Sequence, residues 1–111
     1  MRLKNTLARA SEEINKFDKT KNPLHLEQAG EKIWLAFNVF VQGKFKKKVK
    51  SFTDLKKVVF DSRDPFLIDV FNEAYNLHRF FYQGFRTEDD FVTERDDVVK
   101  VLKKVKTLAE N

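Results

Sequence analysis

The residue in this chain best suited to proton transfer is His78, on the apolar face of a helix predicted over residues 65 to about 84. At roughly 100° per residue, Tyr75 and Tyr82 lie about one turn to either side of it. A neutral imidazole next to a phenol or an amide can act as a general acid or base. The candidate catalytic residues are His78, Tyr82, Asn72 and Asn76. The alternative, which we favour, is a core histidine that hydrogen-bonds a buried carbonyl or tyrosine.

Other kinds of catalytic centre are not predicted. The chain has no cysteine, and its only other histidine is His25. No carboxylate stands three or four residues from His78, the spacing that would place two metal ligands on one helix face. Glycine-rich phosphate loops, nucleophile elbows and zinc signatures are all missing from the sequence. We therefore expect no metal site and no cofactor.

Residues 43–50 read GKFKKKVK and form the densest run of positive charge in the chain. Lysines with an aromatic residue between them can neutralise phosphates and release counterions, so RNA or DNA is one predicted partner. The candidate nucleic-acid-binding residues are Lys44, Lys46, Lys47, Lys48 and Lys50. The alternative, which we favour, is that lysines near the C-terminal end of a helix stabilise its dipole and keep a loop soluble.

Length and composition indicate one globular domain over residues 1–111. Charged residues make up 35% of the chain and hydrophobic residues 41%, with 12 phenylalanines, so a core can form beneath a heavily charged exterior. The net charge of +5 favours anionic partners only mildly. No window approaches the roughly 18 consecutive apolar residues of a membrane span. We expect a soluble cytoplasmic protein that does not enter a membrane.

Helices must position these candidate residues, because apolar residues recur at spacings of three and four along most of the chain. Asn22-Pro23 and Asp64-Pro65 each place a capping residue before a proline at the first helical position. The predicted helices span about 2–19, 23–42 or a turn beyond, 53–62, 65–84, and from 87–90 or 93 to about 109. Short connections between such helices predict an all-α fold, an antiparallel up-and-down bundle of four main helices plus one short helix.

Three apolar residues of the second predicted helix, Trp34, Leu35 and Val39, lie outside its main apolar stripe. Either this helix is buried on two sides within one chain, or a second subunit covers the additional apolar surface. A two-fold homodimer is the commonest arrangement that covers such a patch. We therefore predict a homodimer with these three residues at its interface.

Two segments resemble a known family. Residues 28–36, QAGEKIWLA, and residues 77–84, LHRFFYQG, are similar to the AxEKxWxA and LHxxFY patterns of the archaeal PaREP group. These are small helical proteins allied to the HEPN (higher eukaryotes and prokaryotes nucleotide-binding) superfamily. The order of elements is also similar, with an N-terminal helix, the tryptophan helix, the LH helix and a lysine-rich last helix. The resemblance covers most of the chain.

The resemblance implies an antiparallel helical bundle, commonly dimeric, in a superfamily that includes metal-independent RNases and the partners of small nucleotidyltransferases. Active members carry an arginine separated by four to six residues from a histidine on one helix, and here Phe71, Asn72 and Glu73 occupy those positions. The resemblance therefore implies a non-catalytic dimeric interaction module with a protein partner, in a toxin–antitoxin or mobile-element context. An RNase or RNA-processing domain using His78 is the alternative, and nucleic-acid binding through the lysine run is a third hypothesis.

Overall fold

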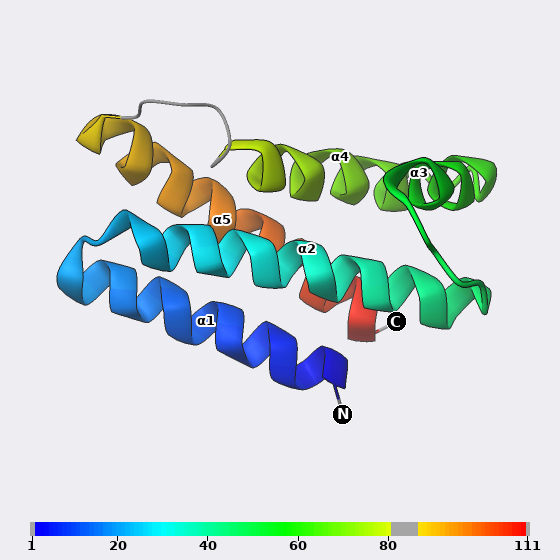
Figure 1. The fold of residues 1–111 in the computed structure, drawn as a ribbon, viewed down its shortest axis with the longest axis horizontal. Helices are drawn as coiled ribbons and strands as arrows, with labels where there is room; N and C mark the ends of the chain where they lie inside the picture. The colour runs from blue at the N-terminus through cyan, green and yellow to red at the C-terminus, as the bar shows by residue number, and fades with distance from the viewer. Residues whose placement is uncertain (1, 81–86, 111) are drawn as a thin grey trace.

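The computed structural model describes residues 2–80 and 87–110, which form five α-helices (Figure 1). The helices are α1 (Arg2–Thr20), α2 (Pro23–Phe45), α3 (Phe52–Asp61), α4 (Pro65–Phe80) and α5 (Glu88–Glu110). No strand occurs within the described ranges, and the predicted all-α class is confirmed. The predicted end of the fourth helix near residue 84 lies outside the described residues, and α5 begins at the earlier of its two predicted starts.

Side-chain caps fix the start of α2 and of α4 where the sequence predicts them. The Asn22 Oδ1 accepts a hydrogen bond from the Leu24 N–H at 3.0 Å. The Asp64 Oδ1 accepts hydrogen bonds from the N–H groups of Phe66 and Leu67 at 3.0 and 3.2 Å. Each cap satisfies backbone donors that have no partner inside the helix, and the proline that follows each cap lacks an N–H to satisfy.

The short helix α3 begins one residue earlier than predicted. Its N-cap is Ser51, whose Oγ accepts a hydrogen bond from the Asp54 N–H at 3.1 Å. The Asp54 Oδ2 in turn accepts a hydrogen bond from the Lys50 N–H at 3.3 Å. These two bonds fix the first turn of α3 and therefore the position of Phe52, its first residue.

The central helix of the molecule is α2. It contacts each of the other four helices, and α5 contacts α1, α2 and α4. Figure 1 shows α2 returning alongside α1 after a short connection. Large apolar side chains fill the space between the helices, and the largest fully buried ones are Phe37, Phe71, Leu26, Ile33, Leu55 and Leu67. The helix α2 is therefore buried on more than one side within one chain. Such burial is one of the two ways to cover its additional apolar residues, and a second subunit is the other.

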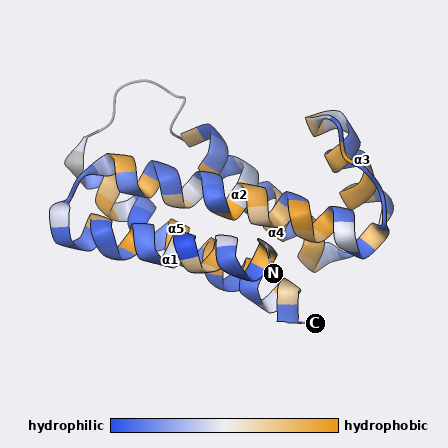
Figure 2. Ribbon diagram, turned by 60° about the horizontal axis from the view of Figure 1, so that its bottom comes forward, coloured by the Kyte–Doolittle hydropathy of each residue, from blue (hydrophilic) through white to orange (hydrophobic). Residues whose placement is uncertain are grey.

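The helix α3 stands at one end of the molecule, away from α1 (Figure 2). It contacts α2 and α4 and buries Leu55 and Val59 there. The rings of Phe52 and Phe60 remain 40% exposed. A helix of 10 residues is too short to be stable alone, so these contacts with α2 and α4 hold it in place.

The buried face of α4 differs from the predicted stripe at His78. Its buried residues are Leu67, Val70, Phe71, Ala74 and Leu77. The sequence pattern places His78 at the centre of the apolar stripe, but its side chain is 30% exposed. The buried face is centred closer to Leu77 because α5 packs on that side of α4, where Leu77 and Val101 line one pocket. His78 therefore lies at the edge of the core.

Ion pairs join α5 to its neighbours. Arg95 donates hydrogen bonds to both carboxylate oxygens of Asp18 in α1, at 3.0 and 2.9 Å. The Lys104 Nζ donates to the carboxylates of Asp69 and Glu73 in α4, at 3.0 and 2.6 Å. The hydrogen bond from Arg95 lowers the pKa of Asp18 against the opposing effect of burial. The hydrogen bonds to Glu73 and Asp69 raise the pKa of Lys104.

Candidate functional site

A pocket of about 580 Å³ lies where α2, α3 and α4 meet. Its lining combines aromatic rings with an amide, an imidazole and a guanidinium; the residues are Trp34, Asn38, Phe52, Leu55, Tyr75, His78 and Arg79. Small-molecule sites in proteins have this size and this kind of lining, mostly apolar with a few polar groups. We call it the aromatic pocket.

Three rings surround the indole of Trp34 in this pocket. Its centroid lies 5.5 Å from the His78 ring at an interplanar angle of 19°, and 5.7 Å from the ring of Tyr75. The Phe52 ring lies 6.5 Å from the Trp34 ring and 4.5 Å from the Tyr75 ring. Such stacked and tilted pairs add about 0.5–1.5 kcal/mol each beyond the area that they bury. The rings thus stiffen one another and keep the pocket wall in a defined shape.

The imidazole of His78 is oriented by a carboxylate from the neighbouring helix. The distance from its Nδ1 to the Glu31 Oε1 is 2.8 Å, and both side chains are about one third exposed, at 30% and 36%. A carboxylate at one ring nitrogen fixes the orientation of an imidazole, as in catalytic dyads and metal ligands. His78 is therefore neither sealed in the core nor open on all sides.

Of the residues at this site, His78 was a candidate catalytic residue and Trp34 a candidate interface residue. The others were not among the candidates: Glu31, Asn38, Phe52, Leu55, Tyr75 and Arg79. Glu31 was missed, although it stands three residues before Trp34 and a helix places such residues on one side. Arg79 is exposed, and it also lines the aromatic pocket with its guanidinium 5.6 Å from the centroid of the Tyr75 ring. This cation–π contact holds a positive charge at the pocket rim.

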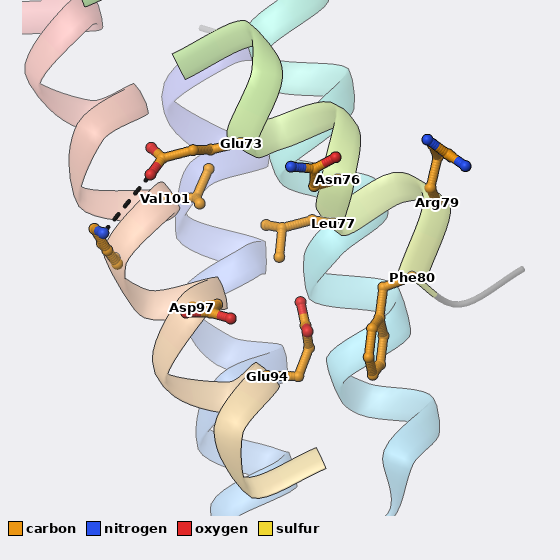
Figure 3. Close-up of a pocket in the computed structure, with 9 residues that line it drawn as sticks. Glu73, Asn76, Leu77, Arg79, Phe80, Glu94, Asp97 and Val101 are labelled. Atoms are coloured by element: carbon orange, nitrogen blue, oxygen red, sulfur yellow. Dashed lines mark ion pairs between the residues drawn. The ribbon is translucent and has the colours of Figure 1, made fainter. Parts of the chain in front are cut away.

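The other predicted catalytic residues do not gather around His78. Asn72 is exposed and lies outside the lining of the aromatic pocket. Asn76 is exposed and lines a different pocket, between α4 and α5, together with Glu94 and Asp97 (Figure 3). Tyr82 lies outside the described residues. The structure thus brings His78 together with Glu31 and the aromatic pocket, and it brings neither asparagine to that pocket.

The pocket between α4 and α5 has charges of both signs in its lining. These are the carboxylates of Glu73, Glu94 and Asp97 and the cations of Arg79 and Lys100. Figure 3 shows Glu94 and Asp97 on α5 facing α4, while Arg79 points away from them. Glu94 is largely buried, with 8% of its surface exposed, and the Glu73 Oε1 lies 3.7 Å from the Lys100 Nζ. Among residues 2–80 and 87–110 there is no group of three histidine, cysteine or acidic side chains that could hold a metal ion.

The predicted nucleic-acid-binding lysines follow the end of α2. We call residues 44–50 the lysine loop; its five lysine side chains are all exposed. Only Lys44 lies in the last turn of α2, whereas Lys46 adopts a left-handed conformation, with φ 52°, that ends the helix. The Gln42 Oε1 accepts a hydrogen bond from the Val49 N–H at 3.3 Å. The backbone of the loop is therefore held to α2 while its lysines point outwards.

None of the lysines in the lysine loop forms an ion pair with a carboxylate of the described chain, and the same holds for Lys56 and Lys57 in α3. Lys44 lies over the rings of Phe40 and Phe45, 5.9 Å from each centroid. The loop leads through Ser51 directly into Phe52, which lines the aromatic pocket. A positively charged surface therefore adjoins an aromatic one.

The three residues predicted at a dimer interface have different surroundings. Trp34 is covered on one side by the rings of α3 and α4, and Val39 is partly buried against the core. Leu35 remains 53% exposed. It lies in a shallow depression along α2 with Glu31 and Asn38 among its lining residues. The surface left for a partner thus centres on Leu35.

In the described residues, no helix is long and apolar enough to cross a bilayer. No model of a protein family matches the chain, and no match was found among curated proteins or among solved structures.

Proposed function

We propose that this protein is a small HEPN-like helical module that binds a protein partner and does not cleave RNA. The observation that carries the proposal is the contact between the two segments on which the resemblance rests. Glu31 and Trp34 of the first segment contact His78 of the second, at 2.8 Å between polar atoms and 5.5 Å between ring centroids. The described part of the second segment thus lies against the first, as two parts of one family motif would.

The loss of catalysis is inferred from the groups around His78. The positions where the resemblance expects an arginine hold Phe71, which is buried, Asn72, which is exposed, and Glu73, which pairs with Lys104. These residues leave no cation on that turn of α4 to stabilise a transition-state phosphate.

An RNase that uses His78 is the alternative, and Arg79 at the rim of the same pocket favours it. The test is RNA degradation by the purified wild type, His78→Ala and Arg79→Ala proteins. We expect no activity above a buffer blank in any of them. Cleavage by the wild type that both substitutions abolish, with both variants still folded, would replace the proposed function by an RNase.

A homodimer is part of the proposal, with the exposed face of α2 around Leu35 as its interface. Leu35→Glu would place a charge in an apolar contact and should convert a dimer into a monomer. Light scattering at micromolar concentration measures the mass, and Leu24→Glu is a matched control because Leu24 is 51% exposed near the start of the same helix. A wild-type mass near 13 kDa that does not change with concentration rules the dimer out.

The packing of the four main helices is proposed to be an antiparallel up-and-down bundle, and the protein is proposed to be cytoplasmic. The start of α1 and the end of α5 support that packing, since Lys4 and Glu110 line one pocket. The chain has no cysteine, so Lys4→Cys combined with Glu110→Cys tests the packing by crosslinking. Efficient intramolecular crosslinking of a monomeric sample is the expected result.

Binding of RNA or DNA through the lysine loop is a second candidate function. The observation that favours it is the contrast between these exposed lysines, which have no carboxylate partner in the described chain, and Lys104, which has two. Unpaired lysines can neutralise phosphates without first breaking an ion pair.

Salt dependence tests this second function. Affinity for a single-stranded oligonucleotide should fall by about 0.7 log units per contacted phosphate for each log unit of salt. The combined substitutions Lys46→Glu, Lys47→Glu and Lys48→Glu should remove most of the binding. The matched control combines Lys4→Glu, Lys19→Glu and Lys103→Glu, at lysines that are also exposed, and gives the same change in net charge. Equal loss in both proteins would mean that only net charge matters.

A further inference from the structure

We infer that the aromatic pocket accepts one base of a single-stranded nucleic acid whose backbone lies along the lysine loop. The inference rests on the second function proposed above, because it requires the lysine loop to hold the phosphates. It adds a site for the base, with stacking rings and polar groups that act in addition to the lysines.

The first argument is the continuity between the two surfaces. Lys50, the last residue of the lysine loop, is separated from Phe52 by Ser51 alone, so the two Cα atoms lie within about 7 Å of each other along the chain. The N-cap of α3 fixes this segment through the hydrogen bond between Ser51 and Asp54. A strand that places a phosphate beside Lys50 therefore has its next base within reach of the pocket.

The second argument is the shape and chemistry of the pocket. Phe52 is 40% exposed and tilts by 33° against the ring of Tyr75, so an aromatic surface remains open for a planar ligand. Stacking of a base on such a ring is worth about 1–3 kcal/mol and depends little on which base it is. The pocket volume of about 580 Å³ suits a ligand of this size.

The third argument is the polar rim. The Asn38 Nδ2 donates to the Trp34 carbonyl at 2.8 Å, and the Asn38 Oδ1 accepts no hydrogen bond from the described residues. That oxygen is available to accept a hydrogen bond from an amino or imino group of a base. The guanidinium of Arg79 has no carboxylate partner in the part of the chain that the structure describes, so it can bind a flanking phosphate.

An anionic membrane is the other large partner that lysines and exposed phenylalanines would fit. Two observations favour a nucleic acid. The rings of Trp34 and Tyr75 line a concave pocket instead of projecting from the surface, and they share it with Asn38. A bilayer would need apolar side chains that project outwards, and it would gain nothing from a hydrogen-bond acceptor beside them.

Trp34 is the only tryptophan of the chain, so its fluorescence reports directly on the pocket. The experiment compares oligo(dT) and oligo(U) with an abasic oligomer of equal length, by Trp34 emission and by anisotropy of the labelled strand. We expect both base-containing strands to quench Trp34 and to bind more tightly than the abasic strand, which should bind without quenching. A difference between oligo(dT) and oligo(U) would distinguish DNA from RNA as the preferred ligand.

The decisive variant is Phe52→Ala, with Phe60→Ala as its matched control. Both rings belong to α3, both are 40% exposed and both contact Phe71, at 5.7 and 5.9 Å, but only Phe52 lines the pocket. Phe52→Ala should weaken binding of oligo(dT) by about 5- to 150-fold, the range for loss of one stacked base, and leave abasic binding unchanged. Phe60→Ala should change neither the binding of oligo(dT) nor the binding of the abasic strand. Arg79→Ala serves as a second variant if Phe52→Ala does not fold.

Each outcome separates this inference from the function on which it rests. Equal binding of oligo(dT) and the abasic strand, unaffected by Phe52→Ala and Arg79→Ala, would overturn the base site and leave the lysine loop as a backbone-binding surface. Absence of any oligonucleotide binding at low salt would rule out both the base site and nucleic-acid binding by the lysine loop. Binding to vesicles of phosphatidylglycerol and phosphatidylcholine without oligonucleotide binding would assign the same surface to a membrane and also overturn the inference.

Discussion

The two histidines of this protein form the same contact in different surroundings. In each, the Nδ1 lies 2.8 Å from a glutamate oxygen on a neighbouring helix: His25 of α2 with Glu13 of α1, and His78 of α4 with Glu31 of α2. Both imidazoles are partly exposed, at 24% and 30%. His78, unlike His25, stacks on Trp34 and lines the aromatic pocket. A histidine paired with a carboxylate is therefore not in itself a sign of a functional site.

The surroundings of His25 indicate a structural role. It lies in the first turn of α2, where its N–H donates to the Asn22 carbonyl at 3.1 Å. Glu13 also lies 3.7 Å from Lys16. Burial raises the pKa of Glu13, but the hydrogen bond with His25 and the nearby charges of Lys16, His25 and Lys32 outweigh it and lower the pKa. This pair fastens the two helices where the chain reverses.

The rings around His78 distinguish the two histidines, and the largest expected effect comes from removing the common support of these rings. Phe71 is buried and lies within about 6 Å of the rings of Trp34, Phe37 and Phe52. Phe71→Ala should lower the free energy of unfolding by about 3–5 kcal/mol, because a cavity is left that neighbouring rings fill only partly. Urea denaturation measures the loss, and an effect below that of Phe60→Ala would contradict the role of Phe71.

The two histidines themselves should differ by a smaller amount. His25→Ala removes a partly exposed pair and should cost about 1 kcal/mol or less. His78→Ala removes a similar pair together with its stacking on Trp34, so we expect a loss of about 1–2 kcal/mol. Denaturation of both variants under one set of conditions gives the difference. Equal losses would mean that the aromatic surroundings of His78 contribute nothing to stability.

The sequence predicted these surroundings only in part, for physical reasons. The caps at Asn22 and Asp64 act within one turn, so the starts of α2 and α4 were readable from local residues. Glu31 and His78 are 47 residues apart, and periodicity within one helix says nothing about which turn of another helix it meets. The partial exposure of His78 also depends on where α5 packs against α4, which no local pattern encodes.

The free energy of unfolding should depend on pH through two paired carboxylates of α1, those of Glu13 and Asp18. The pKa of Glu13 and the pKa of Asp18 are both lowered from their ordinary values, and for Asp18 the hydrogen bond from Arg95 is the largest cause. A lowered pKa in the folded state means that the stabilisation is present above the unfolded-state pKa and is lost as pH falls through the folded-state pKa. Stability should therefore decline below about pH 4.5.

Two substitutions test this assignment. Glu13→Gln and Asp18→Asn should each lower stability at neutral pH and make its decline in acid shallower, because the neutral side chain has no proton to gain. Thermal unfolding from neutral pH down to acid measures both slopes. Variants with the wild-type slope would show that other carboxylates cause the acid loss.

The smallest expected effect is optical and compares the two histidines directly. The His78 ring is stacked at 5.5 Å on Trp34, so replacing it should alter the emission of the indole, whereas no described contact joins His25 to Trp34. Fluorescence of the folded proteins under one set of conditions measures the difference. His78→Gln should shift the Trp34 emission from that of the wild type, and His25→Gln should leave it unchanged. If His25→Gln shifted the emission as much as His78→Gln, the two pairs would be coupled through α2 and the distinction between the histidine of the aromatic pocket and the one outside it would not hold.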